Sequence, residues 1–226
     1  MRKILPVAAT LATLILTAGM ATGNAHAQTT PDARLIAAAE RGDGASVARL
    51  IKDGASPKAR DSAGRTALLA ATQHNRIEVA RELIAAGADV NAQDNIEDSP
   101  YLLAGARGHV EILRMTLAAG ADLKSRNRYG GTALTPACHY GHVETVRELL
   151  KTPIALDHVN KLGWTCLLEA VILGDGGARH AEIVRLVVDA GASLNLADHQ
   201  GITPLAHARQ RGQRAIVAIL ERAGAR

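Results

Sequence analysis

Short apolar runs with helical spacing alternate with polar, glycine-rich segments along the chain from residue 31 onward. Within each run the apolar residues fall on one stripe, as in helices that pack one face against a core. The runs come in pairs, which predicts an inner and an outer helix in each pair. The expected inner helices cover residues 66–74, 99–107, 132–140, 165–173 and 203–211, the expected outer helices cover 76–86, 109–119, 142–151, 180–190 and 213–223, and a first pair occupies roughly 32–53.

The helix pairs repeat with a period of about 33 residues, as in the step from Thr66 to Ser99. Hydroxyl, alanine and glycine residues each recur with this period. In all three series the same step is longer and spans 38 residues. The five extra residues, Asp175 to Arg179, are therefore an insertion, which we expect to form an exposed, mobile loop because it is rich in glycine. The three series are Thr66, Ser99, Thr132, Thr165 and Thr203; Ala38, Ala71, Ala104, Ala137, Ala170 and Ala208; and Gly87, Gly120, Gly191 and Gly224, with Pro153 in place of one glycine.

Three segments of the unit resemble the ankyrin repeat. Gly201-Ile202-Thr203-Pro204-Leu205 is similar to the family's Gly-x-Thr-Pro-Leu-His, Gly108-His109-Val110-Glu111-Ile112 to Gly-His-x-Glu-Ile, and Gly87-Ala88-Asp89-Val90-Asn91 to Gly-Ala-Asp-Val-Asn. The resemblance implies an all-α ankyrin-repeat solenoid of about six helix-turn-helix units with hairpin-like turns. The expected repeats cover approximately residues 31–60, 61–93, 94–126, 127–159, 160–197 and 198–226, within a domain of residues 28–226.

The local chemistry of the unit agrees with this fold. The Thr or Ser that opens each inner helix is expected to cap it by accepting a backbone N–H. The glycine after each outer helix is expected to adopt the left-handed conformation that ends a helix. Glu97 stands where other units have the turn glycine, and Pro136 falls in the first turn of its helix. We expect an Asp or Asn to brace each turn through side-chain-to-backbone bonds, at Asp61, Asp94, Asn127, Asn160 and Asp198.

The first residues have the three-part layout of a secretory signal peptide. Arg2 and Lys3 give a positive head, a mostly apolar stretch follows, and Ala25-His26-Ala27 fits a cleavage site. The apolar stretch is shorter than the ~20 residues of a membrane-spanning helix. We therefore expect residues 1–27 to be removed, and the mature chain to be periplasmic without stable membrane insertion.

The chain has two cysteines, Cys138 and Cys166, and an oxidising compartment favours disulfides. Cys138 is expected near the end of one inner helix and Cys166 near the start of the next. Their offset of five positions gives ~7.5 Å along the helix axis, and the spacing between helices adds ~8–10 Å. Because a disulfide needs Cα atoms within ~7 Å, we expect both thiols to be free and largely buried.

Composition and motifs favour neither catalysis nor nucleic-acid binding. The chain has no nucleophile motif, phosphate loop or Cys-x-x-Cys pair, so we expect no enzyme activity and no cofactor. His109 and His142 occupy a position that is structural in the ankyrin family, and the other histidines lack ligand-like spacing, so no metal site is expected. The net charge of +4 falls to +2 without Arg2 and Lys3, which leaves 24 basic against 22 acidic residues and does not indicate a nucleic-acid partner.

Binding to a protein is the function that the resemblance implies, since solenoids present an extended concave surface. Tyr129, Tyr140 and Trp164 are three of only four aromatic residues, and the register places them on that face in adjacent repeats. Aromatic side chains are frequent interface anchors, although Tyr140 and Trp164 could instead pack against neighbouring units. The expected partner-binding residues are Asn95, Ile96, Asp98, Arg107, Arg128, Tyr129, His139, Tyr140, Lys161, Leu162, Trp164, Leu173, His199 and Gln200.

The leading hypothesis is a monomeric, non-catalytic module that binds a partner protein in the periplasm. It would act as an inhibitor, an immunity-type neutraliser or a stress-related accessory. The alternative is a self-associating structural or assembly factor of the cell envelope. A third class, a metal-binding or enzymatic protein, would require metal that stays with the purified chain.

Overall fold

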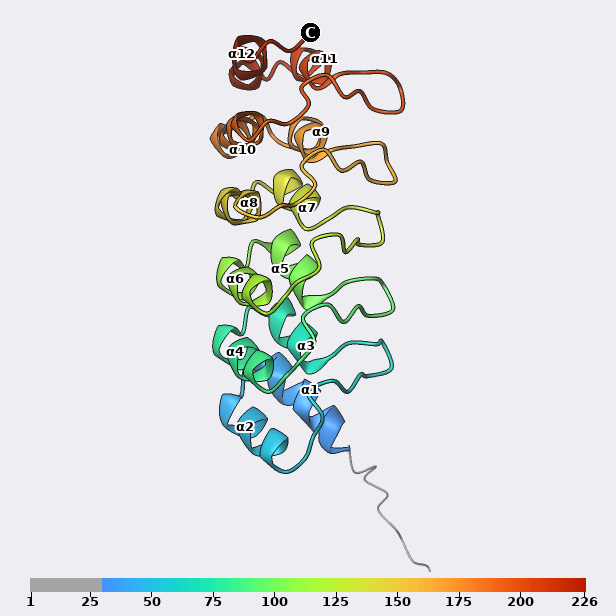
Figure 1. Ribbon diagram of the computed structural model, residues 1–226, viewed down its shortest axis with the longest axis vertical. Coiled ribbons are helices and arrows are strands. Elements are labelled where there is room, and N and C mark those ends of the chain that lie inside the picture. The colour runs from blue at the N-terminus through green and yellow to red at the C-terminus, as the bar shows by residue number, and fades with distance from the viewer. Residues whose placement is uncertain (1–29) are drawn as a thin grey trace, which may run out of the picture.

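The computed structural model describes residues 30–226, and within them twelve helices stack as six pairs (Figure 1). Each pair corresponds to one predicted unit, so the all-α solenoid expected from the sequence is confirmed. The predicted signal peptide, residues 1–27, lies outside the described residues. The helices are α1 (Pro31–Arg41), α2 (Gly44–Lys52), α3 (Ala67–Gln73), α4 (Ile77–Ala85), α5 (Pro100–Arg107), α6 (Val110–Ala118), α7 (Leu134–His139), α8 (Val143–Leu150), α9 (Cys166–Ile172), α10 (Ala178–Asp189), α11 (Pro204–Gln210) and α12 (Arg214–Arg222).

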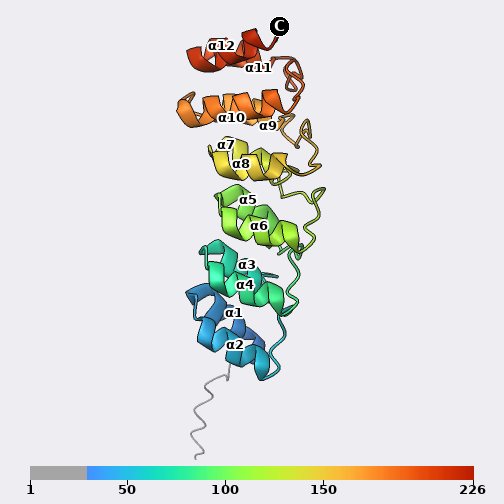
Figure 2. The same cartoon turned by 60° about the vertical axis from the view of Figure 1, so that its left-hand side comes forward.

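The stack has three layers, which Figures 1 and 2 show from two sides. Odd-numbered helices form an inner layer, even-numbered helices form an outer layer, and hairpin-like loops project on the inner side. The core between the helices is built mainly from Ala, Leu, Ile and Val, and Tyr101 is its largest fully buried side chain. Small side chains let successive pairs pack closely. None of α1 to α12 combines the length and hydropathy that a membrane span requires.

Most of the turn chemistry expected from the sequence is confirmed. Thr66, Ser99, Thr165 and Thr203 each cap an inner helix by accepting the backbone N–H three residues further on. Each of the five predicted Asp and Asn braces accepts two backbone N–H groups at 2.9–3.0 Å. The four predicted glycine stops, Gly87, Gly120, Gly191 and Gly224, have φ between 84° and 93°, the left-handed conformation that ends a helix.

The fourth inner helix departs from this pattern. α7 begins at Leu134 with Ala133 as its N-cap, and the buried hydroxyl of Thr132 has no hydrogen-bond partner. Pro136 explains the difference, because it lacks the N–H that would bond to the Thr132 carbonyl and start the helix earlier. The expectation that Thr132 caps this helix is therefore wrong.

Cys138 of α7 and Cys166 of α9 form a disulfide, and their Cα atoms lie 5.5 Å apart. The expectation of two free thiols is therefore wrong. That expectation assumed that neighbouring inner helices are not shifted along their axes. Residues at equivalent positions of successive repeats would then be the nearest neighbours. In the stack these helices are staggered, and the end of one meets the start of the next.

The same stagger occurs one repeat earlier. Gly105 and Ala133 occupy the positions equivalent to Cys138 and Cys166, and they are likewise 28 residues apart (133 minus 105). A Cβ atom on Gly105 would lie only 2.8 Å from the Cβ atom of Ala133. The close approach therefore belongs to the geometry of the repeat, and the two cysteines occupy one instance of it.

The five-residue insertion is only partly a loop. Ala178 and Arg179 form the start of α10, which at 12 residues is the longest of the outer helices. Asp175 accepts the N–H of Gly177 at 2.8 Å and lies 2.7 Å from Nδ1 of His180. The expectation of a loop that continues to residue 179 is therefore wrong for the last two residues. They extend α10 at its N-terminus, and Asp175 holds the first turn of this helix.

Candidate partner-binding groove

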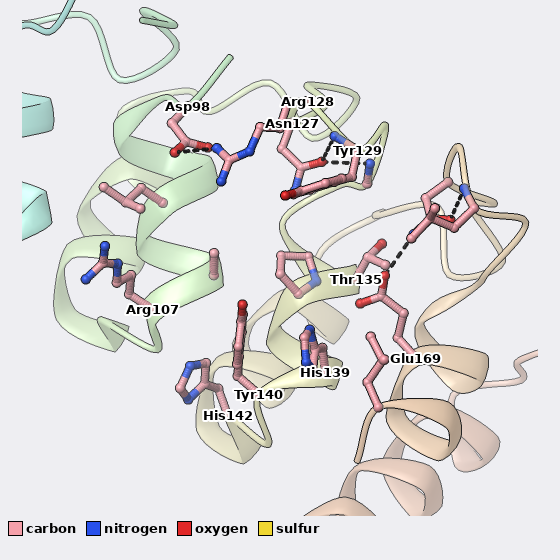
Figure 3. A pocket seen from close by; sticks show the side chains of 17 residues that line it. Asp98, Arg107, Asn127, Arg128, Tyr129, Thr135, His139, Tyr140, His142 and Glu169 are labelled. Atoms are coloured by element: carbon pink, nitrogen blue, oxygen red, sulfur yellow. Dashed lines mark hydrogen bonds and ion pairs between the residues drawn. The ribbon is translucent and has the colours of Figure 1, made fainter. Parts of the chain in front are cut away.

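A groove of about 710 Å³ runs along the inner side of repeats 3 to 5 (Figure 3). The turns before α5, α7 and α9 border it on one side, and the inner helices supply its floor and opposite side. The residues that line it are Asp98, Leu103, Ala106, Arg107, Asn127, Arg128, Tyr129, Gly131, Thr135, Pro136, His139, Tyr140, His142, Asn160, Leu162, Glu169 and Leu173.

The first rim of the groove carries exposed apolar side chains at the tips of the turns. Ile96, Tyr129 and Leu162 stand at equivalent positions of successive repeats, and their exposed fractions are 52%, 54% and 47%. Tyr129 and Leu162 line the groove, whereas Ile96 occupies the same position in the preceding turn. The turn braces hold these tips: the backbone N–H of Tyr129, for example, donates to Oδ1 of Asn127 at 3.0 Å.

The second rim lies at the C-terminal ends of the inner helices. Arg107, Tyr140 and Leu173 again share one position of the repeat, and all three are exposed. The ring of Tyr140 stacks on that of His139, with 4.0 Å between the ring centroids. Stacking restricts the tyrosine ring, so less conformational entropy is lost when a partner covers it.

The floor changes from apolar to acidic along the array. Leu103, Pro136 and Glu169 occupy equivalent positions on α5, α7 and α9. Glu169 is only 7% exposed, and its Oε1 accepts a hydrogen bond from Nδ2 of Asn160 at 2.8 Å. Burial raises the pKa of Glu169 to about 7, and the bond from Asn160 offsets only part of this effect. Glu169 is not among the site residues expected from the sequence, where its one signal is an acid at a position that is apolar in the preceding repeats.

An ion pair between repeats 3 and 4 borders the groove. Nη1 of Arg128 lies 3.3 Å from Oδ2 of Asp98, and the Arg128 guanidinium lies 5.1 Å from the ring centroid of Tyr129. Burial raises the pKa of Asp98 above its usual value, although Arg128 acts in the opposite direction. The charge of Arg128 is thus shared between a carboxylate and an aromatic face.

Asn95, Lys161 and His199, which we expected to contact a partner, pack on the preceding turn instead. Each covers the turn glycine of the repeat before it so closely that a Cβ atom there would lie 2.6–2.9 Å away. Nζ of Lys161 also donates to the backbone oxygen of Arg128 at 2.9 Å. Repeat 3 has Glu97 in place of the turn glycine, and Arg128, which is equivalent to these three residues, forms an ion pair with Asp98. The three side chains therefore connect neighbouring turns and do not line the groove.

Trp164 and Gln200 also lie outside the groove. Trp164 is half-buried, and Gln200 is exposed at the tip that follows Leu162. Trp164 is not part of the groove lining, so its place in one aromatic patch stays a prediction, and Tyr129 and Tyr140 are the aromatic residues of the groove. The expected site residues that the structure brings together are Asp98, Arg107, Arg128, Tyr129, His139, Tyr140, Leu162 and Leu173.

His109 and His142 occupy equivalent N-terminal positions of outer helices α6 and α8. Burial lowers the pKa of both rings, so they are mainly neutral at neutral pH. Among residues 30–226, no group of three or more His, Cys, Asp or Glu side chains is arranged to hold a metal ion. The groove thus offers apolar rims, a few hydrogen-bonding groups and one buried acid.

The fold is that of a helical-repeat protein with a groove along its inner side. The family described as "Ankyrin repeats (3 copies)" matches residues 9–94 and 101–198. The chain therefore belongs to the ankyrin repeat family. Ankyrin repeats are generally protein–protein interaction modules and are typically not catalytic.

Several known proteins are similar to this chain. An ankyrin repeat domain from Acinetobacter baumannii AYE has 56% sequence identity and a TM-score of 0.82 over 85% of this chain and 98% of that one. The ankyrin repeat protein EF0377 has 39% identity and a TM-score of 0.81 over 84% and 97% of the two chains. The ankyrin repeat domain of Bcl-3 has 30% identity and a TM-score of 0.76 over 85% and 86%. YahD of Escherichia coli K12 is described as an ankyrin repeat protein. It is 48% identical over 58 residues, and the match spans 26% of this chain and 29% of YahD.

Proposed function

We propose that this chain is a non-catalytic module that binds a partner protein through the groove of repeats 3 to 5. One observation carries the proposal: two rims of exposed apolar side chains, Tyr129 with Leu162 and Tyr140 with Leu173, border the same groove. Exposed apolar side chains gathered in this way mark interaction sites, and tyrosine is a frequent anchor. A bound segment of the partner would cover both rims at once.

We also propose that the chain acts in the periplasm, as an inhibitor, immunity-type neutraliser or stress-related accessory of its partner. The charged head at Arg2 and Lys3 and the segment Ala25-His26-Ala27 support export. The disulfide supports it as well, because disulfides persist in oxidising compartments. Mass spectrometry of the mature chain should find Gln28 at the N-terminus, whereas a membrane-bound chain that keeps Met1 would contradict export.

The groove is tested by capture of proteins from a periplasmic extract with three versions of the chain. The wild type is compared with Tyr129→Ser/Tyr140→Ser and with the control Val159→Ser/Leu196→Ser, which removes exposed apolar side chains outside the groove. We expect one protein to be enriched by the wild type and the control but not by the groove variant. With that protein purified, loss of the anchors should weaken Kd about thirtyfold or more, equivalent to ~2 kcal/mol. Equal binding by all three versions would contradict the proposal.

Self-association in the cell envelope is the alternative use of the same rims. We propose that the chain is a monomer, and light scattering coupled to size-exclusion chromatography measures this directly. A stable dimer that dissociates on Tyr129→Ser/Tyr140→Ser would show that a second copy of the chain occupies the groove.

A further inference from the structure

We propose that the groove accepts a basic side chain, lysine or arginine, from the partner protein, and that its cation pairs with the carboxylate of Glu169. This inference rests on the proposed function, because it presumes that a protein segment occupies the groove. It adds the feature by which the groove would select the partner's segment, namely a basic residue with apolar neighbours.

The first observation is that one oxygen of Glu169 is left for a ligand. Oε1 accepts the hydrogen bond from Asn160, and this is the carboxyl group's only hydrogen bond to a residue of the described chain. The residue is only 7% exposed, and it belongs to the groove lining. Figure 3 shows the carboxylate of Glu169 directed into the groove, with a dashed line for its hydrogen bond.

The second observation is that the fold does not require an acid at this position. The equivalent residues of repeats 2, 3 and 4 are Ala70, Leu103 and Pro136. Repeat 6 has His207 there, which bonds to Asp198 of its own turn at 2.7 Å. If Glu169 served only to brace Asn160, a glutamine would accept the same hydrogen bond without the cost of a buried charge.

The third observation is that the groove supplies no cation for Glu169. Arg128 of repeat 4 is held by its ion pair with Asp98, and Arg107 projects from the end of α5, two repeats away from Glu169. Burial lowers the pKa of His139 and of His142, so neither ring adds a positive charge near neutral pH. The remaining ionisable groups that line the groove are Asp98, Tyr129 and Tyr140, none of which is a cation.

A partner's cation would offset the cost of a buried, unpaired carboxylate. The apolar side chains around Glu169 suit the rest of a basic side chain. Leu162 and Leu173 flank Glu169 within repeat 5, and Tyr129 and Tyr140 occupy the corresponding rims of repeat 4. The aliphatic stem of a lysine or arginine would pack between these rims while its head reaches the floor. Neutral segments would leave Glu169 unpaired, so the acid selects against them.

Two capped tripeptides that differ in charge alone test the proposal: Ac-Leu-Arg-Leu-NH2 and Ac-Leu-citrulline-Leu-NH2. Each is titrated at pH 8 into the full chain, while NMR follows the methyl groups of Leu162 and Leu173 and the side-chain carbon of residue 169. We expect the arginine peptide to bind about tenfold more tightly than the citrulline peptide. In Glu169→Gln, which keeps an acceptor for Asn160, this preference should disappear. The control Glu78→Gln, at an 81% exposed side chain of α4, should retain it.

The possible outcomes separate this inference from the proposed function. If both peptides shift the groove methyl groups with equal affinity, the preference for a cation is wrong and the groove remains a binding site. If the preference persists in Glu169→Gln, a different acid carries it and the assignment to Glu169 is overturned. If neither peptide shifts the groove methyl groups at millimolar concentration, the inference is contradicted, and the capture experiment with Tyr129→Ser/Tyr140→Ser decides the groove's role separately.

Discussion

The Nε2 atom of His180 lies 2.8 Å from the backbone oxygen of His139, so the outer helix of repeat 5 binds the end of the inner helix of repeat 4. The other ring nitrogen, Nδ1, lies 2.7 Å from Oδ1 of Asp175. The ring is buried, and both of its nitrogens have a partner. The insertion therefore supplies one half of a contact between two repeats that border the groove.

Deletion of residues 175–179 should lower the free energy of unfolding by about 1–3 kcal/mol, because it removes the Asp175 partner and the start of α10. His180→Ala should cost a similar amount, since it leaves the His139 oxygen without its donor. Urea unfolding followed by circular dichroism measures both values. Arg179→Ala, at an exposed neighbour, is the control and should be nearly neutral. A deletion as stable as the wild type would show that the insertion is passive.

Removal of the disulfide should destabilise the chain by about 3–4 kcal/mol, the value that loop entropy gives for a 28-residue separation. Guanidinium unfolding of the wild type with and without reductant measures this difference. Cys138→Ala/Cys166→Ala should unfold at the same denaturant concentration in either condition. A thiol reagent should find no reactive cysteine in the denatured, unreduced wild type. Two reactive thiols per chain would contradict the bond.

Gly105→Ala tests the stagger of the inner helices. Alanine is favoured over glycine inside a helix by about 1 kcal/mol, so helix propensity alone predicts stabilisation. The new Cβ atom would, however, lie 2.8 Å from Cβ and 3.0 Å from the backbone oxygen of Ala133. Because backbone must move to relieve this contact, we expect a net loss of about 1–3 kcal/mol in thermal or urea unfolding. A stabilised variant would mean that α5 and the start of α7 are further apart.

The stability of the chain should depend on the ionisation of Glu169. Its pKa rises from 4.5 to about 7 on folding, so the native state binds more protons than the unfolded state between these pH values. The free energy of unfolding therefore falls as pH rises through this window, by up to about 3 kcal/mol at ~1.4 kcal/mol per pKa unit. Glu169→Gln has no acid to titrate at this position, so it does not show this loss. The free energy of unfolding of the wild type minus that of the variant should therefore decline from pH 5 to pH 8. A constant difference would show that Glu169 titrates normally.

The period of the sequence was enough to predict the fold because each unit repeats the same local chemistry. The hydroxyl caps, the Asp and Asn braces and the glycine stops depend on neighbours within a few residues, so they can be predicted from spacing. The apolar rims could be predicted for the same reason. Tyr129 and Tyr140 are exposed because their positions in the unit are exposed in every repeat.

The features that could not be predicted from the sequence depend on contacts between repeats. The stagger that joins Cys138 to Cys166 arises from how whole helices pack, and no single repeat contains it. Trp164 has the same position as two groove residues, Asp98 and Gly131, yet it is not part of the groove lining. Glu169 was missed because an acid on a helix is ordinarily solvated, and only the assembled groove buries it.

The disulfide also determines where the array can come apart. In a solenoid each unit contacts only its neighbours, so fraying starts at the ends and advances one repeat at a time. The bond between α7 and α9 joins repeats 4 and 5, which leaves three repeats free to detach on one side and only repeat 6 on the other. Amide hydrogens of α7 and α9 should therefore exchange last, and together. The two repeats that carry Tyr129, Tyr140 and Glu169 would keep their spacing while both ends of the chain open and close.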